Sequence, residues 1–293
     1  MDAIIQGDEA MPQQKATLWA CLAFVCLTAP STPFAIAEQP NAAPKLLSAF
    51  FGLDNALPFV ANALCLGASG LDGMPVIFSH TLASDSLQAD DFQVITASGA
   101  TQTPHCVTLR PAQDPGELRT VLLIGEFGNA NDDPPTSVQI IDDLHSDGQN
   151  GQTVNFKGSS VQVIPLNAGP SLVLAERIPL ANLAKETRGT ACPESRQQVV
   201  RATWAGGVRL PKREEPGDVQ RKLYRVTVKQ TDGALREVVP FELADLEDGD
   251  NNHLLCLDTE DVAVSVSFPA GHFVDPNQDL NPDTQTHIQQ GIN

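Results

Sequence analysis

The sequence has few aromatic residues and few bases. Phe, Trp and Tyr make up 5% of its 293 residues, with only one Tyr and two Trp. Since carbohydrate-binding surfaces usually rely on exposed Trp and Tyr, this scarcity disfavours a lectin. The 18 Lys and Arg residues stand against 36 Asp and Glu residues, a net charge of −18. This charge argues against nucleic acid or an anionic membrane surface as a partner.

Familiar motifs of catalysis and metal binding are also missing. The chain contains no GxSxG, Walker A, GxGxxG or HExxH pattern, and no Cys/His spacing typical of zinc. It has no Asn-x-Ser/Thr glycosylation site either. The sequence therefore names no reaction, although 42% hydrophobic residues predict a folded chain.

The N-terminal segment has the pattern of a signal peptide. Lys15 precedes an apolar run from Ala16 to Ala29, and Ala35-Ile36-Ala37 supplies small residues for cleavage. A signal peptide over residues 1–37 predicts a secreted or periplasmic protein with no integral membrane span. A start at Met11 would give a more ordinary signal, because residues 1–14 carry acids and no Lys or Arg. The alternative is a buried N-terminal helix.

Cleavage after residue 37 would remove Cys21 and Cys26 and leave four cysteines. An even number of cysteines in an exported chain predicts disulfides, and four cysteines allow three pairings. We favour Cys65–Cys106 and Cys192–Cys256, because each pair then stays within one half of the chain.

The pattern of the remaining chain is that of β-strands. Short apolar runs recur between clusters of Gly, Pro, Asn and Asp, and no long helical pattern separates them. In the first half these runs are Val76–Phe78, Phe92–Thr96, Val107–Leu109, Thr120–Ile124, Val138–Ile141, Ser160–Ile164 and Ser171–Ala175. The sequence thus predicts an all-β protein of two sandwich-like halves.

The order of segments along the chain follows from these runs. We expect an N-terminal segment over 38–61, a first β domain over 62–180 and a second over 190–293, with the boundary between Pro179 and Pro193. Within the first segment, residues 44–51 predict a short amphipathic helix with Leu46, Leu47, Phe50 and Phe51 on one side. No internal repeat is visible in the sequence.

One stretch, over about residues 70–130, resembles bacterial Ig-like domains of exported proteins. The pattern consists of an apolar strand ending in Phe78-Ser79, a turn with Ser86-Leu87, and a strand starting at Asp91-Phe92-Gln93-Val94. Where the pattern usually has an acidic residue after Phe-Ser, this chain has His80. Such modules serve mostly as spacers or adhesive units, so the resemblance implies a fold and little chemistry.

Alternation is clearest in the second half. Gln198–Trp204 reads as a strand with Val200, Ala202 and Trp204 on one face. A second strand runs from Tyr224 and turns at Asp232-Gly233 into Leu235–Val239, which is a strong hairpin pattern. We also expect Leu254–Asp258 to pair with Val262–Phe268 through a turn at 259–261, with Val262, Val264, Val266 and Phe268 on one face.

Two acidic loops rich in Asp and Asn, the first over residues 245–253 and the second over residues 275–283, flank that last hairpin, within a segment, 237–293, that has no Lys or Arg. If the hairpin forms, the loops converge, and their carboxylates need a cation between them. Calcium binds six to eight oxygens of this kind. The sequence therefore suggests a calcium site formed by Asp248, Asp250, Asn252, Asp275, Asn277 and Asp279. It is not an EF-hand, because Leu280 occupies the position that requires Gly. The simpler alternative is a pair of solvated acidic turns.

Two histidines bracket the same hairpin end. His253 and His272 lie near Asp250 and Asp275 in sequence, and a His beside a carboxylate is the usual general acid/base pair. The simpler alternative is that both are ordinary loop histidines. Separately, the basic block Lys185–Arg236 offers Arg201, Arg209 and Arg213 for an anionic ligand, unless these side chains merely balance the surrounding acids.

Two functions follow from these patterns. The first is a non-catalytic binding or structural module, stabilised by calcium, whose ligand is a small molecule or a protein. The alternative is an extracellular hydrolase, lyase or cyclase that uses His253 and His272 with nearby carboxylates. The alternative predicts a concave pocket at the hairpin end.

Overall fold

The computed structural model describes residues 43–112, 114–148, 152–183, 189–211, 214–244 and 249–290. The chain divides into two units, residues 1–42 and 43–293, and the fold described below is that of the second unit. The predicted signal peptide therefore lies outside the described residues, as does Asp248 of the first acidic loop. Within the described ranges, no helix is long and apolar enough to cross a membrane.

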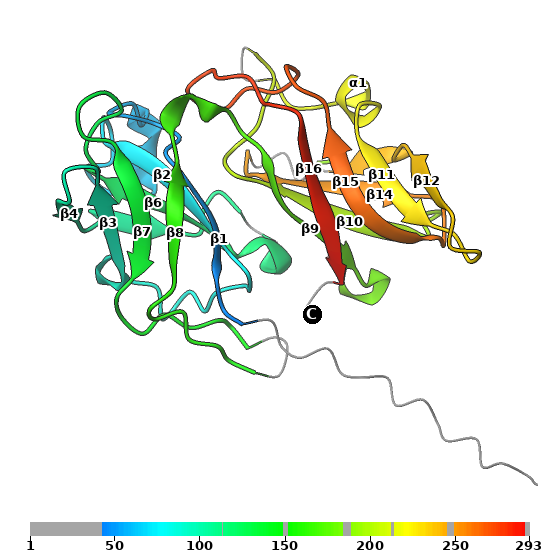
Figure 1. Ribbon diagram of the computed structural model, residues 1–293, viewed down its shortest axis with the longest axis horizontal. Coiled ribbons are helices and arrows are strands. Elements are labelled where there is room, and N and C mark those ends of the chain that lie inside the picture. The colour runs from blue at the N-terminus through cyan, green and yellow to red at the C-terminus, as the bar shows by residue number, and fades with distance from the viewer. Residues whose placement is uncertain are drawn as a thin grey trace, which may run out of the picture. The chain divides into compact units, whose positions relative to one another are not determined.

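The described chain belongs to the all-β class, as the sequence predicted, with strands as its main regular structure. It forms two sheets of eight strands each (Figure 1). The first sheet contains β1 (Leu46–Phe50), β2 (Asp72–Phe78), β3 (Phe92–Thr96), β4 (Thr101–Gln102), β5 (Cys106–Thr108), β6 (Thr120–Gly125), β7 (Pro135–Ile140) and β8 (Ser160–Ile164). The second contains β9 (Leu172–Ile178), β10 (Gln198–Trp204), β11 (Arg225–Lys229), β12 (Leu235–Val238), β13 (Glu242–Ala244), β14 (Asn252–Leu257), β15 (Val262–Phe268) and β16 (Thr284–Gln290).

Helical structure is confined to short connections. These are one α-helical turn, α1 (Asp218–Arg221), and the 3-10 turns Phe59–Ala63, Ala89–Asp91, Pro115–Glu117, Leu166–Ala168 and Leu180–Asn182. The passage from the first to the second sheet falls between Ile164 and Leu172, upstream of the segment where the sequence places the boundary.

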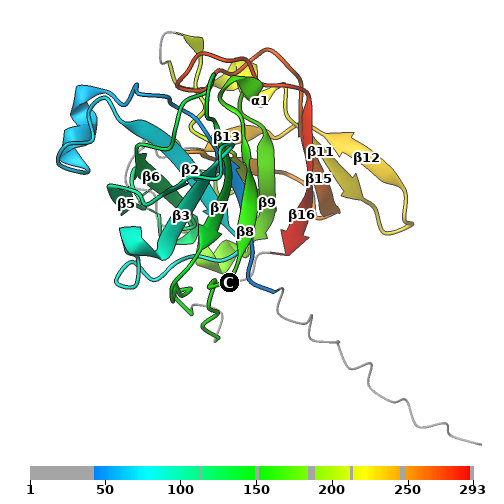
Figure 2. The same cartoon turned by 60° about the vertical axis from the view of Figure 1, so that its left-hand side comes forward.

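The two sheets have the same topology. The first has the strand order β4-β3-β7-β8-β1-β2-β6-β5, and the second has β12-β11-β15-β16-β9-β10-β14-β13. Adding eight to each strand number converts the first order into the second. Each sheet contains one parallel pair, β1 with β8 and β9 with β16, and the latter two strands lie side by side in both views (Figures 1 and 2). The chain therefore contains a repeat of topology that its sequence does not reveal.

Each sheet curls around its own core. In the first, buried side chains of β2 and β6 pack against those of β3 and β7, and three of them are Phe78, Phe92 and Val121. In the second, Val200, Ala202 and Trp204 of β10 pack against β11 and β15, as their alternation predicted. Burying a large apolar side chain contributes about 1.5–3 kcal/mol. These two clusters are therefore the main source of stability.

The short helix expected over residues 44–51 is a strand, β1. It pairs antiparallel with β2 and parallel with β8. Leu46, Ala49 and Phe50 are buried, and so is the intervening Ser48. A short apolar run does not distinguish a helix from a strand. Here the strand forms because two neighbouring strands satisfy its backbone hydrogen bonds.

The prediction of a hairpin between β14 and β15 is also wrong. β14 pairs with β10 and β13, whereas β15 pairs with β11 and β16. The connection between them is held by the Gln198 side chain, whose Nε2 donates to the Asp261 carbonyl at 2.7 Å. A bulge at Val264 shifts the register of β15, so that Ala263 is buried and Val262 is 45% exposed. The hairpin of β11 and β12, by contrast, is confirmed.

Both predicted disulfides are present, Cys65–Cys106 and Cys192–Cys256. Each ties the long connection between the first two strands of its half to a strand near the same end of the sheet, the edge strand β5 in the first half and β14, next to the edge strand, in the second. The cross-links therefore occupy related places in the two repeats.

Candidate functional site

Two buried ion pairs join the halves. Arg119, at the start of β6, lies 3.2 Å from Glu176 of β9. Arg201 of β10 lies 3.7 Å from Glu117 and donates to the Gly116 carbonyl. All four side chains are buried, and Arg201 and Glu176 are paired in the β9–β10 register. Burial lowers the pKa of the Arg119 guanidinium, and the Glu176 carboxylate opposes that shift. Such a network fixes one half against the other.

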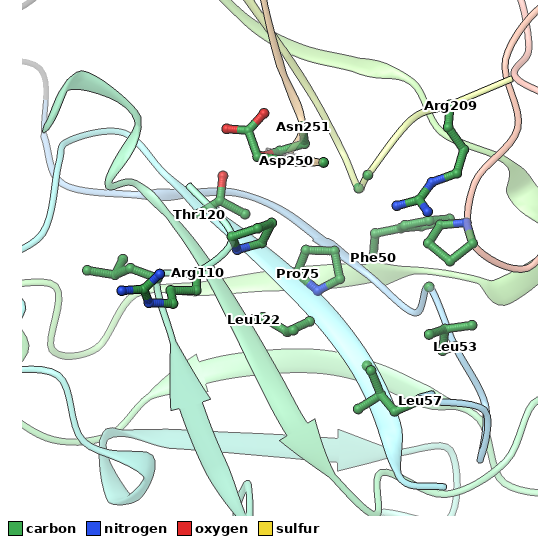
Figure 3. A pocket seen from close by; sticks show the side chains of 18 residues that line it. Phe50, Leu53, Leu57, Pro75, Arg110, Thr120, Leu122, Arg209, Asp250 and Asn251 are labelled. Carbon is green, nitrogen blue, oxygen red and sulfur yellow. The ribbon is translucent and has the colours of Figure 1, made fainter. Parts of the chain in front are cut away.

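A cavity of about 210 Å³ lies beside this junction. Its apolar side comes from the first half, with Phe50, Leu53, Leu57, Pro75, Leu109 and Leu122. Its other side comes from loops of the second half, chiefly 206–209, 249–251 and Pro276. Figure 3 shows the apolar side chains below Asp250 and Asn251, with Arg110 and Arg209 on opposite sides.

Two consecutive glycines shape the cavity. A Cβ at Gly206 would come within 2.8 Å of the Phe50 ring, so only glycine permits this close approach. A Cβ at Gly207 would meet nothing closer than 3.9 Å, and one of the atoms at that distance is Arg209 Nη2. Position 207 thus faces open space within the cavity lining.

Among the described residues, those that line the cavity and carry a charge are Arg110, Arg209 and Asp250. Arg209 is half-buried, and its backbone is fixed by two hydrogen bonds to Val274, of 3.1 and 2.9 Å. The Nε of Arg209 is buried and has no hydrogen-bond partner within the described residues. Asp250 accepts the backbone N–H of Asn252 at 2.7 Å and its side-chain amide at 2.6 Å.

Both acidic loops reach this cavity, the first through Gly249–Asn251 and the second through Pro276. The two loops are brought together without a β14–β15 hairpin, because each is bound to the end of β10 or to the segment that follows it. Asn251 Nδ2 donates to the Trp204 carbonyl at 2.6 Å, and Val274 bridges to Arg209. The position of the loops therefore depends on β10.

Asp275 is the most unusual group of the second loop. It is fully buried, and its Oδ1 accepts the Asp279 N–H at 2.9 Å, while Oδ2 has no hydrogen-bond partner within the described residues. Burial raises the pKa of this carboxyl to about 6. Asn277 Nδ2 donates to Asp279 Oδ2 at 2.7 Å. Across the described ranges, no group of three or more His, Cys, Asp and Glu side chains could hold a metal ion.

The two candidate histidines lie apart from the cavity lining. His253 is 2% exposed, and its Nδ1 lies 2.7 Å from the Tyr224 hydroxyl. That hydroxyl accepts the Trp204 indole N–H at 3.0 Å. Burial lowers the pKa of His253 to about 4, and the ring is therefore neutral at physiological pH. His272 is exposed, with its ring 6.2 Å from that of Phe268.

The sequence pointed to only part of this site. It named Arg209 and Asp250, but not the apolar wall of Phe50, Leu53 and Leu122. The pair Gly206-Gly207 was the available signal, because two glycines after a buried strand indicate a close approach of backbone to another group.

Comparison with known proteins gives no family. No protein-family model matches the chain, and no curated protein matches it. Solved structures that resemble it include the N-terminal part of the bacterial S-layer protein SbsC, with a TM-score of 0.27 and 10% identity over 85% of this chain. Domains 1–6 of SbsC give a TM-score of 0.29 and 12% identity. The chain spans 44% and 26% of the lengths of those structures. With TM-scores this low, the likenesses assign neither fold family nor function.

Proposed function

We propose that the chain is an exported, non-catalytic binding protein of two Ig-like modules, whose ligand occupies the cavity between them. The observation that carries this proposal is the cavity itself, which is lined by residues of both halves, and the buried pairs Arg119–Glu176 and Arg201–Glu117 join those halves. Ligand sites are usually apolar, largely preformed concavities with a few polar groups.

The strand order supports the Ig-like part. In Ig folds, strands A, B, E and D lie on one side of the core and C, F and G on the other, with C′ added in some members. The order β1-β2-β6-β5 corresponds to A-B-E-D, and β4-β3-β7-β8 corresponds to C′-C-F-G. The second half has the same order.

Export is supported by the disulfides Cys65–Cys106 and Cys192–Cys256, because such bonds persist in oxidising compartments. The non-catalytic part is supported by the cavity lining. Its one described carboxylate, Asp250, is engaged with Asn252, and neither His253 nor His272 is among its residues.

Filling the cavity tests this function. Gly207→Leu places a side chain in the open space, and its matched control is Gly217→Leu, at an extended position with nothing within 4 Å. We expect ligand-observed NMR with hexanoate, 1-hexanol and hexylamine to detect binding of at least one probe to wild type and to Gly217→Leu, and none to Gly207→Leu. Equal binding by all three proteins, or by none, would contradict the proposal.

Stabilisation by calcium is part of the same proposal. It is supported by the buried Oδ2 of Asp275, which a cation would neutralise. Millimolar calcium is expected to raise the melting temperature of wild type and not that of Asp275→Asn. An unchanged wild-type melting temperature would remove calcium from the proposal and leave the cavity unaffected.

A further inference from the structure

We infer that the ligand of the cavity is a monoanion with a compact apolar body, whose charged group binds the Arg209 guanidinium. This inference rests on the proposed binding function and names the chemical class of ligand. It follows from three properties of the cavity: its size, its apolar wall and its local charge.

Size and wall define the body of the ligand. A cavity of about 150 Å³ lined by aliphatic and aromatic residues holds benzene. The present cavity is larger, about 210 Å³, and its wall is formed by Phe50, Leu53, Leu57 and Leu122. It therefore suits an apolar body of about six to eight carbon atoms.

Local charge defines the head of the ligand. The whole chain has a net charge of −18. Yet the described residues that line the cavity include two guanidinium groups, Arg110 and Arg209, and one carboxylate, Asp250. The charges of these described residues therefore sum to +1 within an acidic protein. One negative charge on the ligand balances it, whereas a cation would add to it.

Arg209 is the group placed to receive that charge. Its backbone is held by Val274, and its buried Nε has a donor that no described residue accepts. An unmatched buried donor is costly, and a carboxylate can accept two parallel hydrogen bonds from a guanidinium. Arg110 lies on the other side of the cavity and is exposed, so it adds positive potential (Figure 3).

Isothermal titration calorimetry with three probes of equal chain length tests the inference. Hexanoate, 1-hexanol and hexylamine differ only in the head group. We expect hexanoate to bind wild type at least about tenfold more tightly than the other two. Arg209→Gln is expected to reduce hexanoate affinity by about tenfold or more and to leave 1-hexanol affinity unchanged.

Controls separate this effect from general ones. Lys229→Gln removes the same charge from an exposed residue of β11 and should leave hexanoate affinity unchanged. Arg209→Lys retains the charge without the bidentate geometry of the guanidinium, so it tests the inference even if Arg209→Gln does not fold. We expect Arg209→Lys to bind hexanoate less tightly than wild type does. We also expect this variant to bind hexanoate more tightly than it binds hexylamine.

The outcomes of these experiments distinguish the inference of an anionic ligand from the proposed binding function on which it rests. Equal affinity for hexanoate and 1-hexanol, with binding lost in Gly207→Leu, would overturn the anionic head and retain the cavity as a site. Tighter binding of hexylamine would also overturn it. Binding of no probe, or binding indifferent to Gly207→Leu, would overturn both.

Discussion

Replacing Glu176 by Gln is expected to lower the free energy of unfolding by about 3–5 kcal/mol. The substitution preserves the shape of the side chain and removes its charge. It leaves the Arg119 guanidinium buried at the junction of the halves without its carboxylate, and the side chains of the pair are only 3% and 4% exposed.

The separation of the two groups sets the magnitude. Unit charges at the 3.2 Å of this pair attract each other by about 5 kcal/mol at an effective dielectric constant of 20. Desolvation offsets that attraction in the intact pair, so replacing both partners by apolar residues should cost little. The double variant Arg119→Met, Glu176→Leu is therefore expected to be more stable than Glu176→Gln alone.

Urea unfolding measures these differences. The only Trp downstream of residue 37 is Trp204, in the core of the second half, so its fluorescence reports that half while circular dichroism reports both. Asp142→Asn is the control, because the Lys157–Asp142 pair is 49% and 66% exposed and should contribute little to stability. A loss below about 1 kcal/mol in Glu176→Gln, or equal losses in the single and double variants, would refute the reasoning.

Further predictions concern the second half. Tyr224→Phe removes the acceptor of the Trp204 N–H and the hydrogen-bond partner of His253 Nδ1, and is expected to cost about 1–3 kcal/mol in urea unfolding. His253 has a folded pKa of about 4, below its usual 6.5, so only the unfolded chain takes up its proton between these values. Stability should therefore decrease as the pH is lowered from 6.5 to 4, and His253→Gln should remove this contribution from the pH profile. The pKa of Asp275 is raised from 3.8 to about 6, so its stabilising contribution is present below pH 3.8 and lost as pH rises through 6. Asp275→Asn is accordingly expected to raise stability at pH 7 in calcium-free buffer by about 1–3 kcal/mol, measured by urea unfolding. Replacing Cys192 and Cys256 by Ser should lower stability by about 2–5 kcal/mol in the same assay.

The strands were the most predictable part of the fold. Apolar runs bounded by Gly, Pro, Asn and Asp located β3 and β8 to the residue and most of the others to within a few residues. Local pattern failed where pairing decides the outcome. Residues 46–50 form a strand because β2 and β8 flank them, and β14 does not pair with β15 because it lies between β10 and β13.

The candidate site was less predictable, because its parts come from both halves. Asp250 and Arg209 stand out in sequence through charge, and both line the cavity. Phe50 and Leu122 are ordinary core-type residues in sequence, and only tertiary packing brings them to loops that follow more than eighty residues later in the chain (Figure 3). The repeat was hidden for a related reason, since one strand order can be built from many sequences with the same alternation.

The parallel strand pairs determine how each half carries a pulling load. The chain enters the first half through β1 and leaves through β8, and it enters the second through β9 and leaves through β16. Each entry strand pairs in parallel with its exit strand, as at Ala49 with Val163 and at Ala175 with Ile288. Tension on the two ends of a half therefore slides these strands along each other, and their evenly spaced hydrogen bonds share the load at once instead of opening in succession. A surface protein anchored at one end and loaded at the other would be held by these two short ladders.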